Sequence, residues 1–405
     1  MEGEGGGIWV NTGSLQVANS TLSGNQAIID GEGGAIGEGQ TGDFVALIES
    51  TVSGNTTTDS STSSASFTTL DNTSGGGAIF SFGTTSVVDS TIANNSAGDS
   101  SGSVTFGGGG GVLNQGTAEV AGSVISENTS AGSGNNCSSV GTAVTDEGYN
   151  FSAGSSCGFA AANHGADAAT LSLGVLGPNG GPSALVTDTI ALQGTGSADA
   201  AVGAIAPSAL ATVAANGTGT SATVDLCGES ATTSENSFLG VSLASDQRGV
   251  ARSASACDAG AFEQSSSQTT ITSTSPASPV AGDAVSVAVS VGSPSPATAP
   301  SGSVTVTASG SDSGTCTALL TSGSGSCSIT FPTAGSVSLS AAYAPGDAVA
   351  SSTSGSVTVA SVAPTVTGIS PSSGPAAGGT TVTVSGTNLS GEIAIDFGTT
   401  AAASA

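Results

Sequence analysis

Basic residues are nearly absent from this sequence. Its 405 residues include 29 Asp and Glu but two Lys and Arg in total, and the formal net charge is −27. Nucleic acid is excluded as a partner, because phosphate groups are bound through Lys and Arg. An anionic membrane surface is disfavoured for the same reason. The carboxylates could bind calcium, or they could keep a surface rich in small residues from associating, and their wide spacing favours the second interpretation.

Aromatic residues, histidine and long apolar runs are also scarce. Aromatic residues make up 3% of the chain, and His164 is its single histidine. No apolar run reaches the length of a membrane-spanning helix, so this part of the chain is not expected to span a membrane. The opening residues Met1–Gly5 lack the basic and apolar regions of a signal peptide. Since the chain opens inside a repeat, we expect an N-terminal truncation rather than a cytosolic protein.

Internal repetition is the strongest positive signal. A phrase of small residues followed by aliphatics recurs at Gly6-Gly7-Ile8, Gly33-Gly34-Ala35-Ile36, Gly76-Gly77-Ala78-Ile79 and Gly110-Gly111-Val112-Leu113. A second phrase, Ser-Thr-aliphatic or Ser-Val-Ile, closes with Asn25, Asn55, Asn95 and Asn128. These asparagines are 30, 40 and 33 residues apart. A constant core with variable spacing indicates a constant rung with loops of different length.

The repeats predict β-strands, because apolar and small polar residues alternate with a period of two. A unit of three short strands cannot bury its own apolar face, but stacked units bury a continuous column. We therefore expect Ile36, Ile79 and Val112 or Leu113 in one inward column, and Val52, Ile92 and Ile125 in another. The repeated asparagines are expected at left-handed corners and in hydrogen-bonded ladders. Residues Thr56–Ser66 are expected to form a low-complexity loop.

These repeats resemble the right-handed parallel β-helix repeats of bacterial polymorphic outer-membrane proteins and related exported adhesin-like proteins. The resemblance covers residues 1–135. Residues 136–263 lose the repeat, but they close with Asp246-Gln247-Arg248-Gly249 and Cys257-Asp258-Ala259-Gly260-Ala261-Phe262-Glu263. This pair of motifs is similar to the end of the β-helix domain of choice-of-anchor Q proteins, which are exported and attached to the cell surface. The resemblance implies that residues 136–263 are the C-terminal part of the β-helix domain.

Both arginines, Arg248 and Arg252, lie beside Asp246, Asp258 and Glu263 in this closing stretch. They could form a site for an anionic ligand. They could instead form a partly buried ion-pair network that locks the last rung of the solenoid. The second interpretation is favoured, because the motif belongs to the end of a domain.

Six cysteines fall into three local pairs, Cys137 with Cys157, Cys227 with Cys257, and Cys316 with Cys327. Six cysteines allow about fifteen connectivities, but each of these pairs lies inside one sequence unit. An even number in an exported β-protein predicts disulfides. A zinc site is disfavoured, because Cys-x-x-Cys spacing and further histidines are missing.

The pattern changes after a linker at residues 264–268. Residues 269–362 contain alternating strands about ten residues apart, which is typical of a β-sandwich, and they resemble a bacterial Ig-like repeat domain. Residues 363–405 contain Val366-Thr367-Gly368-Ile369-Ser370-Pro371 and Gly378-Gly379-Thr380-Thr381-Val382. They resemble the first part of an IPT/TIG Ig-like domain, and we expect the chain to be cut at this end too. The predicted fold is therefore all-β, a right-handed parallel β-helix followed by Ig-like β-sandwich modules.

The sequence favours a non-enzymatic surface protein, in which a solenoid presents loops and Ig-like modules carry it. No catalytic residue, cofactor or metal site is predicted, although calcium stays possible. A lone His164 is more often structural than a general base, and no Lys or Arg precedes Arg248. The expected partner is a protein or glycan on a host or neighbouring cell, bound above all through residues Thr56–Leu70, and the expected location is the bacterial cell surface. Two alternatives stay open, a polysaccharide lyase or hydrolase with its site in missing rungs, and a purely structural spacer.

Overall fold

The computed structural model describes most of the chain. The described residues are 5–28, 32–59, 75–99, 108–131, 134–179, 187–193, 199–228, 237–253, 256–264, 267–293, 299–345, 351–389 and 395–402. They divide into two compact units, a first that includes residues up to Ser265 and a second that begins at Ser266. Most of the loop expected at Thr56–Leu70 lies outside the described residues, which stop at Asp59 and resume at residue 75.

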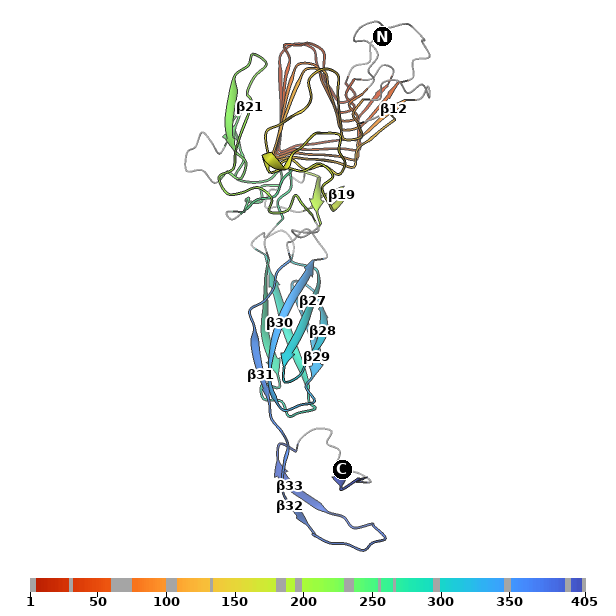
Figure 1. Ribbon diagram of the computed structural model, residues 1–405, viewed down its shortest axis with the longest axis vertical. Coiled ribbons are helices and arrows are strands. Elements are labelled where there is room, and N and C mark those ends of the chain that lie inside the picture. Colours follow the sequence, from red (N-terminus) through yellow and green to blue (C-terminus); the bar gives the residue numbers. More distant parts are fainter. Residues whose placement is uncertain are drawn as a thin grey trace. The chain divides into compact units, whose positions relative to one another are not determined.

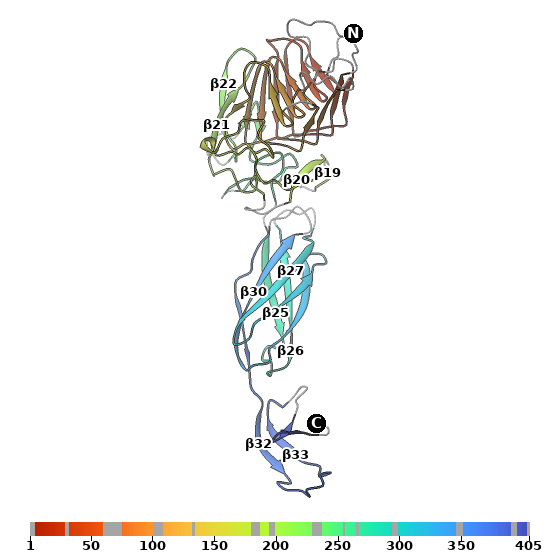
Figure 2. The same ribbon diagram turned by 45° about the vertical axis from the view of Figure 1, so that its right-hand side comes forward.

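Four parallel sheets make up the repeats of the first unit, and neighbouring strands in each sheet come from successive repeats (Figures 1 and 2). Sheet A contains β1 (Ile8–Val10), β5 (Ile36–Glu38), β9 (Ile79–Ser81), β13 (Val112–Asn114) and β17 (Cys137–Ser139). Sheet B contains β2 (Ser14–Ala18), β6 (Phe44–Ile48), β10 (Thr84–Val88), β14 (Thr117–Ala121) and β18 (Thr145–Asp146). Sheet C contains β3 (Thr21–Ser23), β7 (Thr51–Ser53), β11 (Thr91–Ala93) and β15 (Val124–Ser126). Sheet D contains β4 (Gln26–Ile28), β8 (Thr56–Asp59), β12 (Ser96–Asp99) and β16 (Thr129–Ser130).

This arrangement is a parallel β-helix, as the sequence predicted, but each of the first four rungs has four strands and not three, and a fifth rung contributes β17 and β18. The missed strand is that of sheet D. Its member β8 (Thr56–Asp59) lies where we expected a loop, and it pairs in parallel with β4 and β12. Threonine favours strands because it is β-branched. The low-complexity composition that follows concealed this strand.

The two predicted inward columns are confirmed. Ile36 is paired with Ile79, and Ile79 with Val112, and all three are at most 1% exposed. Val52, Ile92 and Ile125 stack in the same way in sheet C, and each is fully buried. Parallel strands lie about 4.8 Å apart, so each aliphatic side chain contacts the rungs on either side of it. Stacking therefore supplies the core that a single rung lacks.

The predicted asparagine ladder is present at the corner between sheets C and D. The Asn55 Nδ2 donates to Asn95 Oδ1 at 2.9 Å, and the Asn95 Nδ2 donates to Asn128 Oδ1 at 2.9 Å. The left-handed corner is one residue earlier than expected. It is formed by Gly24, Gly54, Asn94 and Glu127, with φ between 55° and 68°.

A serine ladder marks the corner between sheets B and C. The Ser50 backbone N–H donates to Ser90 Oγ at 3.2 Å, and the Ser90 N–H donates to Ser123 Oγ at 3.1 Å. Here too a left-handed residue precedes each ladder residue, and Glu49 and Asp89 occupy this position before Ser50 and Ser90. The repeat thus specifies both corners by a left-handed residue followed by a hydrogen-bonding side chain.

Parallel stacking continues past residue 135. Cys137 extends the column of Ile36, Ile79 and Val112, and it forms a disulfide with Cys157. Phe159 joins the same core cluster. The last rungs are therefore closed by a cross-linked segment that contains the short 3₁₀ helix η1 (Ala161–Asn163).

The rest of the first unit turns back along the outside of the β-helix. A hairpin of β19 (Leu173–Gly177) and β20 (Thr189–Leu192) comes first. It is followed by residues 199–264, which we call the flank segment. Its strands are β21 (Leu210–Ala214), β22 (Ser221–Asp225), β23 (Ser237–Phe238) and β24 (Val241–Ser242). Hairpin β21–β22 stands beside the rungs in both views (Figures 1 and 2).

The flank segment covers the outer faces of sheets B and C. Ser86 Oγ of β10 donates to the Ala214 carbonyl at 2.8 Å. Thr51 Oγ1 of β7 donates to Gln247 Oε1 at 2.7 Å, and the Ala261 N–H donates to Thr91 Oγ1 at 3.0 Å. As a result β6 is buried on both faces. The outward side chains of Thr51 and Thr91 are thus hydrogen-bonded inside the protein and are not available to a partner.

The second unit contains a β-sandwich. One sheet has the order β25-β26-β29, with bounds Gln268–Ser275, Ala284–Gly292 and Ser324–Thr330. The other has the order β28-β27-β30-β31, with bounds Gly314–Leu319, Gly302–Gly310, Gly335–Pro345 and Val357–Ser361. Valines from both sheets meet in a core with Phe331 and Tyr343. The Cys316–Cys327 disulfide joins β28 to β29, where the chain passes from one sheet to the other.

The last described strands form two small hairpins, β32 (Thr365–Ser370) with β33 (Thr383–Thr387) and β34 (Asp396–Phe397) with β35 (Thr400–Ala401). Val366, Ile369 and Phe397 are among the exposed large apolar side chains. No closed core forms among the described residues of this segment.

Candidate functional site

Arg252 joins the flank segment to the second rung of the β-helix. Its Nε donates to Glu49 Oε1 at 3.0 Å, and its Nη2 donates to Glu49 Oε2 at 2.8 Å, which makes the pair bidentate. Nη1 also donates to the Asp258 carbonyl at 2.7 Å, and it lies 3.7 Å from Glu263 Oε2. The side chains of Arg252 and Glu49 are fully buried. Bidentate pairs of this kind fix geometry as well as charge.

Arg248 holds the two closing motifs together. Its Nε donates to Asp246 Oδ2 at 2.9 Å, and its Nη1 donates to the Asn179 carbonyl at 2.9 Å. Its guanidinium lies 3.7 Å from the centre of the Phe262 ring. Asp246 also accepts the backbone N–H groups of Val250 and Glu263, each at 2.9 Å. The site is therefore filled by groups of the chain itself, which disfavours an anionic ligand here.

The buried carboxylates outnumber the two guanidiniums. Burial raises the pKa of Asp89 to about 8, although Arg252 lowers it, and neither carboxylate oxygen of Asp89 has a hydrogen-bond partner. Burial and the neighbouring Glu263 raise the pKa of Asp258 to about 8. Burial also raises the pKa of Glu49 well above its usual value, against the opposing effect of Arg252. Burial lowers the pKa of Arg252, but the charges of Glu49 and Asp89 outweigh this and raise it, so the arginine stays charged.

The five motif residues predicted from the sequence are brought together, but they do not lock the last rung. Arg252 binds Glu49 in the second rung and interacts with Asp89 in the third. Sequence reasoning missed Glu49 and Asp89, which are 203 and 163 residues before Arg252. The sequence did contain a signal for this pair of carboxylates, because Glu49 and Asp89 both stand directly before the serine of the Ser-Thr phrase, in adjacent repeats. Asn19 and Gly122 occupy this position in the flanking repeats.

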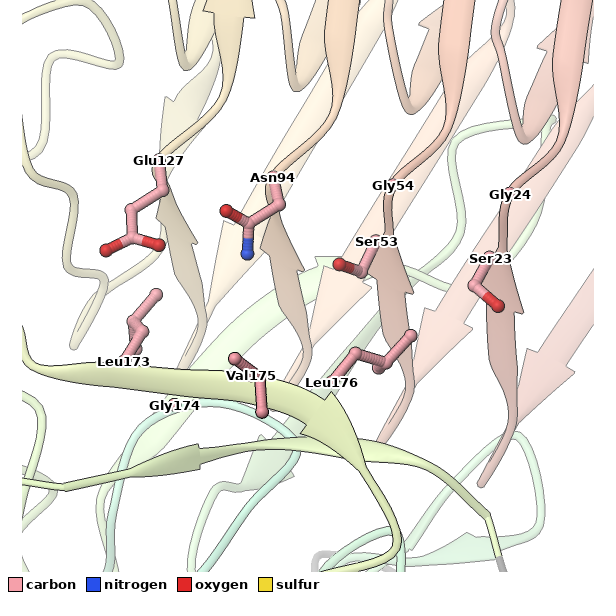
Figure 3. Close-up of a pocket in the computed structure, with 10 residues that line it drawn as sticks. All are labelled: Ser23, Gly24, Ser53, Gly54, Asn94, Glu127, Leu173, Gly174, Val175 and Leu176. Carbon is pink, nitrogen blue, oxygen red and sulfur yellow. The ribbon is translucent and has the colours of Figure 1, made fainter.

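A groove of about 580 Å³ lies between the corner of sheets C and D and strand β19 (Figure 3). One wall is the row of left-handed corner residues, Gly24, Gly54, Asn94 and Glu127, one from each of four successive rungs. Ser23 and Ser53 also contribute to this wall. Leu173, Gly174, Val175 and Leu176 form the opposite wall. Sequence reasoning missed this groove, because β19 bears no repeat motif that would place it beside the rungs.

The three disulfides pair each cysteine with its near neighbour. Cys137–Cys157, Cys227–Cys257 and Cys316–Cys327 close spans of 20, 30 and 11 residues, and no cysteine is free. The Cys227–Cys257 disulfide is fully internal, and it ties the end of β22 to the second closing motif. This disulfide thus cross-links the flank segment within itself, whereas the Arg252–Glu49 ion pair joins the segment to the β-helix.

Other candidate sites are sparse in the described part of the chain. No group of three or more His, Cys, Asp or Glu side chains there is arranged to hold a metal ion. His164 is exposed, has φ 62°, and stacks on Tyr149 at 4.8 Å between ring centres. Among the same described residues, no helix has the length and apolar character needed to cross a bilayer.

Comparison with known proteins identifies the C-terminal segment. Residues 364–405 match the family model of the IPT/TIG domain. This segment is an IPT/TIG domain. The IPT/TIG domain is an Ig-like module. No curated protein and no solved structure is significantly similar to the chain.

Proposed function

We propose that this chain is a non-enzymatic, adhesin-like protein exported to the bacterial surface. The β-helix presents a binding surface, and the Ig-like β-sandwich and the IPT/TIG domain act as the modules that carry it. The similarity of the closing motifs to choice-of-anchor Q proteins supports surface attachment. Three disulfides and no free cysteine support export, because disulfides persist in oxidising compartments.

The uncovered side of the β-helix carries this proposal. The flank segment occupies the outward hydroxyls of sheet C, but the corresponding row on sheet D is not buried. That row consists of Gln26, Thr56, Ser96 and Thr129, which are paired in register. It lies beside the corner residues that line the groove. A strip of repeated hydroxyl and amide groups can form many weak contacts with a partner, which suits adhesion.

The chemistry of this strip favours binding over bond cleavage. Polysaccharide cleavage on such a fold needs an acid and a base within hydrogen-bond reach of the substrate. Hydroxyl and amide groups donate and accept hydrogen bonds, but they do not transfer protons at neutral pH. Glu49 and Asp89, whose pKa values are raised, are buried where Arg252 of the flank segment contacts the β-helix. They support a structural role for the acidic cluster.

The test is a binding and turnover assay of the full chain. Immobilised protein is exposed to bacterial and epithelial cells, and separately to a polysaccharide panel with and without calcium. We expect saturable cell binding without release of sugar products. The variant Thr56→Ala/Ser96→Ala should weaken binding, whereas Thr315→Ala/Thr317→Ala on the exposed strand β28 should not. Robust polysaccharide turnover would refute the proposal, and so would equal loss of binding in both variants.

A further inference from the structure

We propose that the groove between the corner residues and β19 binds an extended, positively charged peptide segment of a partner protein. This inference rests on the proposed binding role of the uncovered side and names the class of partner. It is carried by three features of the groove, which are its repeat spacing, the backbone it exposes and its charge.

The length of the groove suits an extended chain. Its polar wall takes one residue from each of four successive rungs, and these follow one another in register along the β-helix (Figure 3). Three steps of about 4.8 Å give about 14 Å, which is the length of about four residues of a β-strand at about 3.4 Å each. An extended peptide would therefore span the wall from Gly24 to Glu127.

Backbone is exposed on both walls. Gly24 and Gly54 bear no side chain on one wall, and Gly174 can line the other wall with its backbone alone. Strand β19 belongs to a two-stranded sheet with β20, so one edge of β19 has no strand partner among the described residues. An unpaired edge is the surface to which a peptide adds as a further strand, and a glycan cannot reproduce that ladder. The geometry thus favours a peptide over a sugar.

The apolar wall of the groove, formed by β19, is exposed to solvent. Val175 is 85% exposed, the largest exposed fraction among the large apolar side chains described. Leu173 and Leu176 flank it on β19 and are half-buried. Alternate side chains of an extended peptide point to one face. Aliphatic residues on that face would pack against these three side chains.

Charge decides which peptide fits. Glu127 is the charged residue among those that line the groove, and it stands at one end of the row. The chain has a net charge of −27, and both of its arginines are buried in ion pairs. An anionic ligand would be repelled, and a segment of a second copy of this chain could not supply an accessible Lys or Arg. The occupant is therefore a segment of another protein with aliphatic side chains and a basic residue near Glu127.

The test titrates the full chain with a blocked hexapeptide that alternates valine and threonine and carries one terminal lysine. A matched peptide carries glutamate in place of lysine. We expect saturable binding of the lysine peptide that weakens with salt, and at least about fivefold weaker binding of the glutamate peptide. Glu127→Asn should weaken binding about two- to fivefold and reduce the salt dependence. Asparagine suits this left-handed position, since Asn94 occupies it in the preceding rung.

Two glycine variants separate blocking of the groove from damage to the fold. Gly54→Asn should weaken binding about tenfold, because it places a side chain in the groove. Its Cβ would meet no atom closer than 3.9 Å, and its φ of 68° is close to that of Asn94. Gly203→Asn is the matched control, with φ 58°, no atom within 4 Å of its Cβ, and a place outside the groove. It should leave the affinity unchanged.

The outcomes that overturn the inference are distinct from those that overturn the proposed function. No saturable binding up to about 1 mM, equal binding of both peptides, or equal loss in both glycine variants would refute the peptide inference. Binding of a neutral oligosaccharide that Gly54→Asn abolishes would also refute it, yet it would leave the proposed adhesive function intact. Loss of peptide binding in Gly54→Asn with cell binding preserved would support the groove as a peptide site but place the cell-surface partner elsewhere on the uncovered side.

Discussion

Replacing Arg252 by methionine should detach the flank segment from the β-helix. The substitution keeps most of the aliphatic packing but removes both hydrogen bonds to Glu49 and the donors to the carbonyls of Asp258 and Gly260. Breaking a buried ion pair by removing one partner costs about 3–5 kcal/mol, because the other charge stays buried. Each carbonyl left without a donor adds about 1 kcal/mol or more. The expected loss is therefore about 5–7 kcal/mol, a large part of the stability of an ordinary domain.

The assay is amide hydrogen exchange followed by mass spectrometry, because the chain has more than one unit and a single unfolding free energy is not defined for it. Protection should fall in residues 199–264 and on the covered strand β6, while the Asn95 ladder keeps its protection. The double variant Arg252→Met/Glu49→Gln removes the stranded charge and should recover about half of the loss. A loss below about 1 kcal/mol in the single variant would refute the reasoning, and so would a uniform loss across the unit or a double variant less stable than the single one.

Three further outcomes follow from the same structure. Burial raises the pKa values of Asp89 and Asp258 to about 8, so the unfolded chain binds fewer protons between pH 4 and pH 8. Stability should then fall as the pH rises through this range, by up to about 1.4 kcal/mol per pH unit for each group. Urea unfolding midpoints at pH 5 and pH 8 measure this fall. In Asp89→Asn the dependence of stability on pH should be weaker. Asn95→Ala should cost about 3 kcal/mol, because it strips hydrogen bonds from two neighbouring rungs, and an unchanged urea midpoint would contradict the ladder. Removing the Cys227–Cys257 disulfide by serine substitution should cost about 3–4 kcal/mol on the chain-entropy model for a span of 30 residues, which thermal unfolding of the double variant measures.

The rungs could be predicted from the sequence because their information is local and repeated. The alternation of apolar and polar residues shows which side of a strand faces inward, and the repeated phrases show which strands are neighbours. The column of Ile36, Ile79 and Val112 follows from these two patterns. Sheet D was not predicted, because a run of threonine such as that of β8 occurs both in strands and in polar loops. The pattern also does not show whether the outward side of a strand faces water or another segment, so the contacts of Thr51 and Thr91 with the flank segment could not be predicted.

The flank segment and the groove depend on contacts that no local pattern encodes. Arg252 and Glu49 are 203 residues apart. Nothing in the closing motif around Arg252 indicates a partner in the repeats, and nothing in the repeat around Glu49 indicates a partner in the closing motif. Strand β19 has an ordinary aliphatic sequence, and nothing in it places Val175 opposite the row of corner residues. Such pairings depend on the shape and charge of two surfaces that form only when the chain has folded. The sequence contains the residues of both surfaces, but it does not show that they meet.

The placement of the acidic corner residues shows how a repetitive surface can specify one position. Rungs about 4.8 Å apart present nearly the same hydroxyls, so hydrogen bonds to Thr21, Thr51 and Thr91 alone would let the flank segment shift by one rung at modest cost. Glu49 and Asp89 break this equivalence, because the same corner position is a neutral residue in the rungs on either side. A shift by one rung would replace one of the two acidic neighbours of Arg252 by a neutral corner residue, Asn19 or Gly122, and the buried guanidinium would lose part of its electrostatic stabilisation. Buried ion pairs add little net stability over a well-packed apolar core, and selecting a register is their best-attested use. In this protein, Arg252 and its two acidic neighbours fix the flank segment over sheets B and C, and the described residues of the flank segment do not cover sheet D.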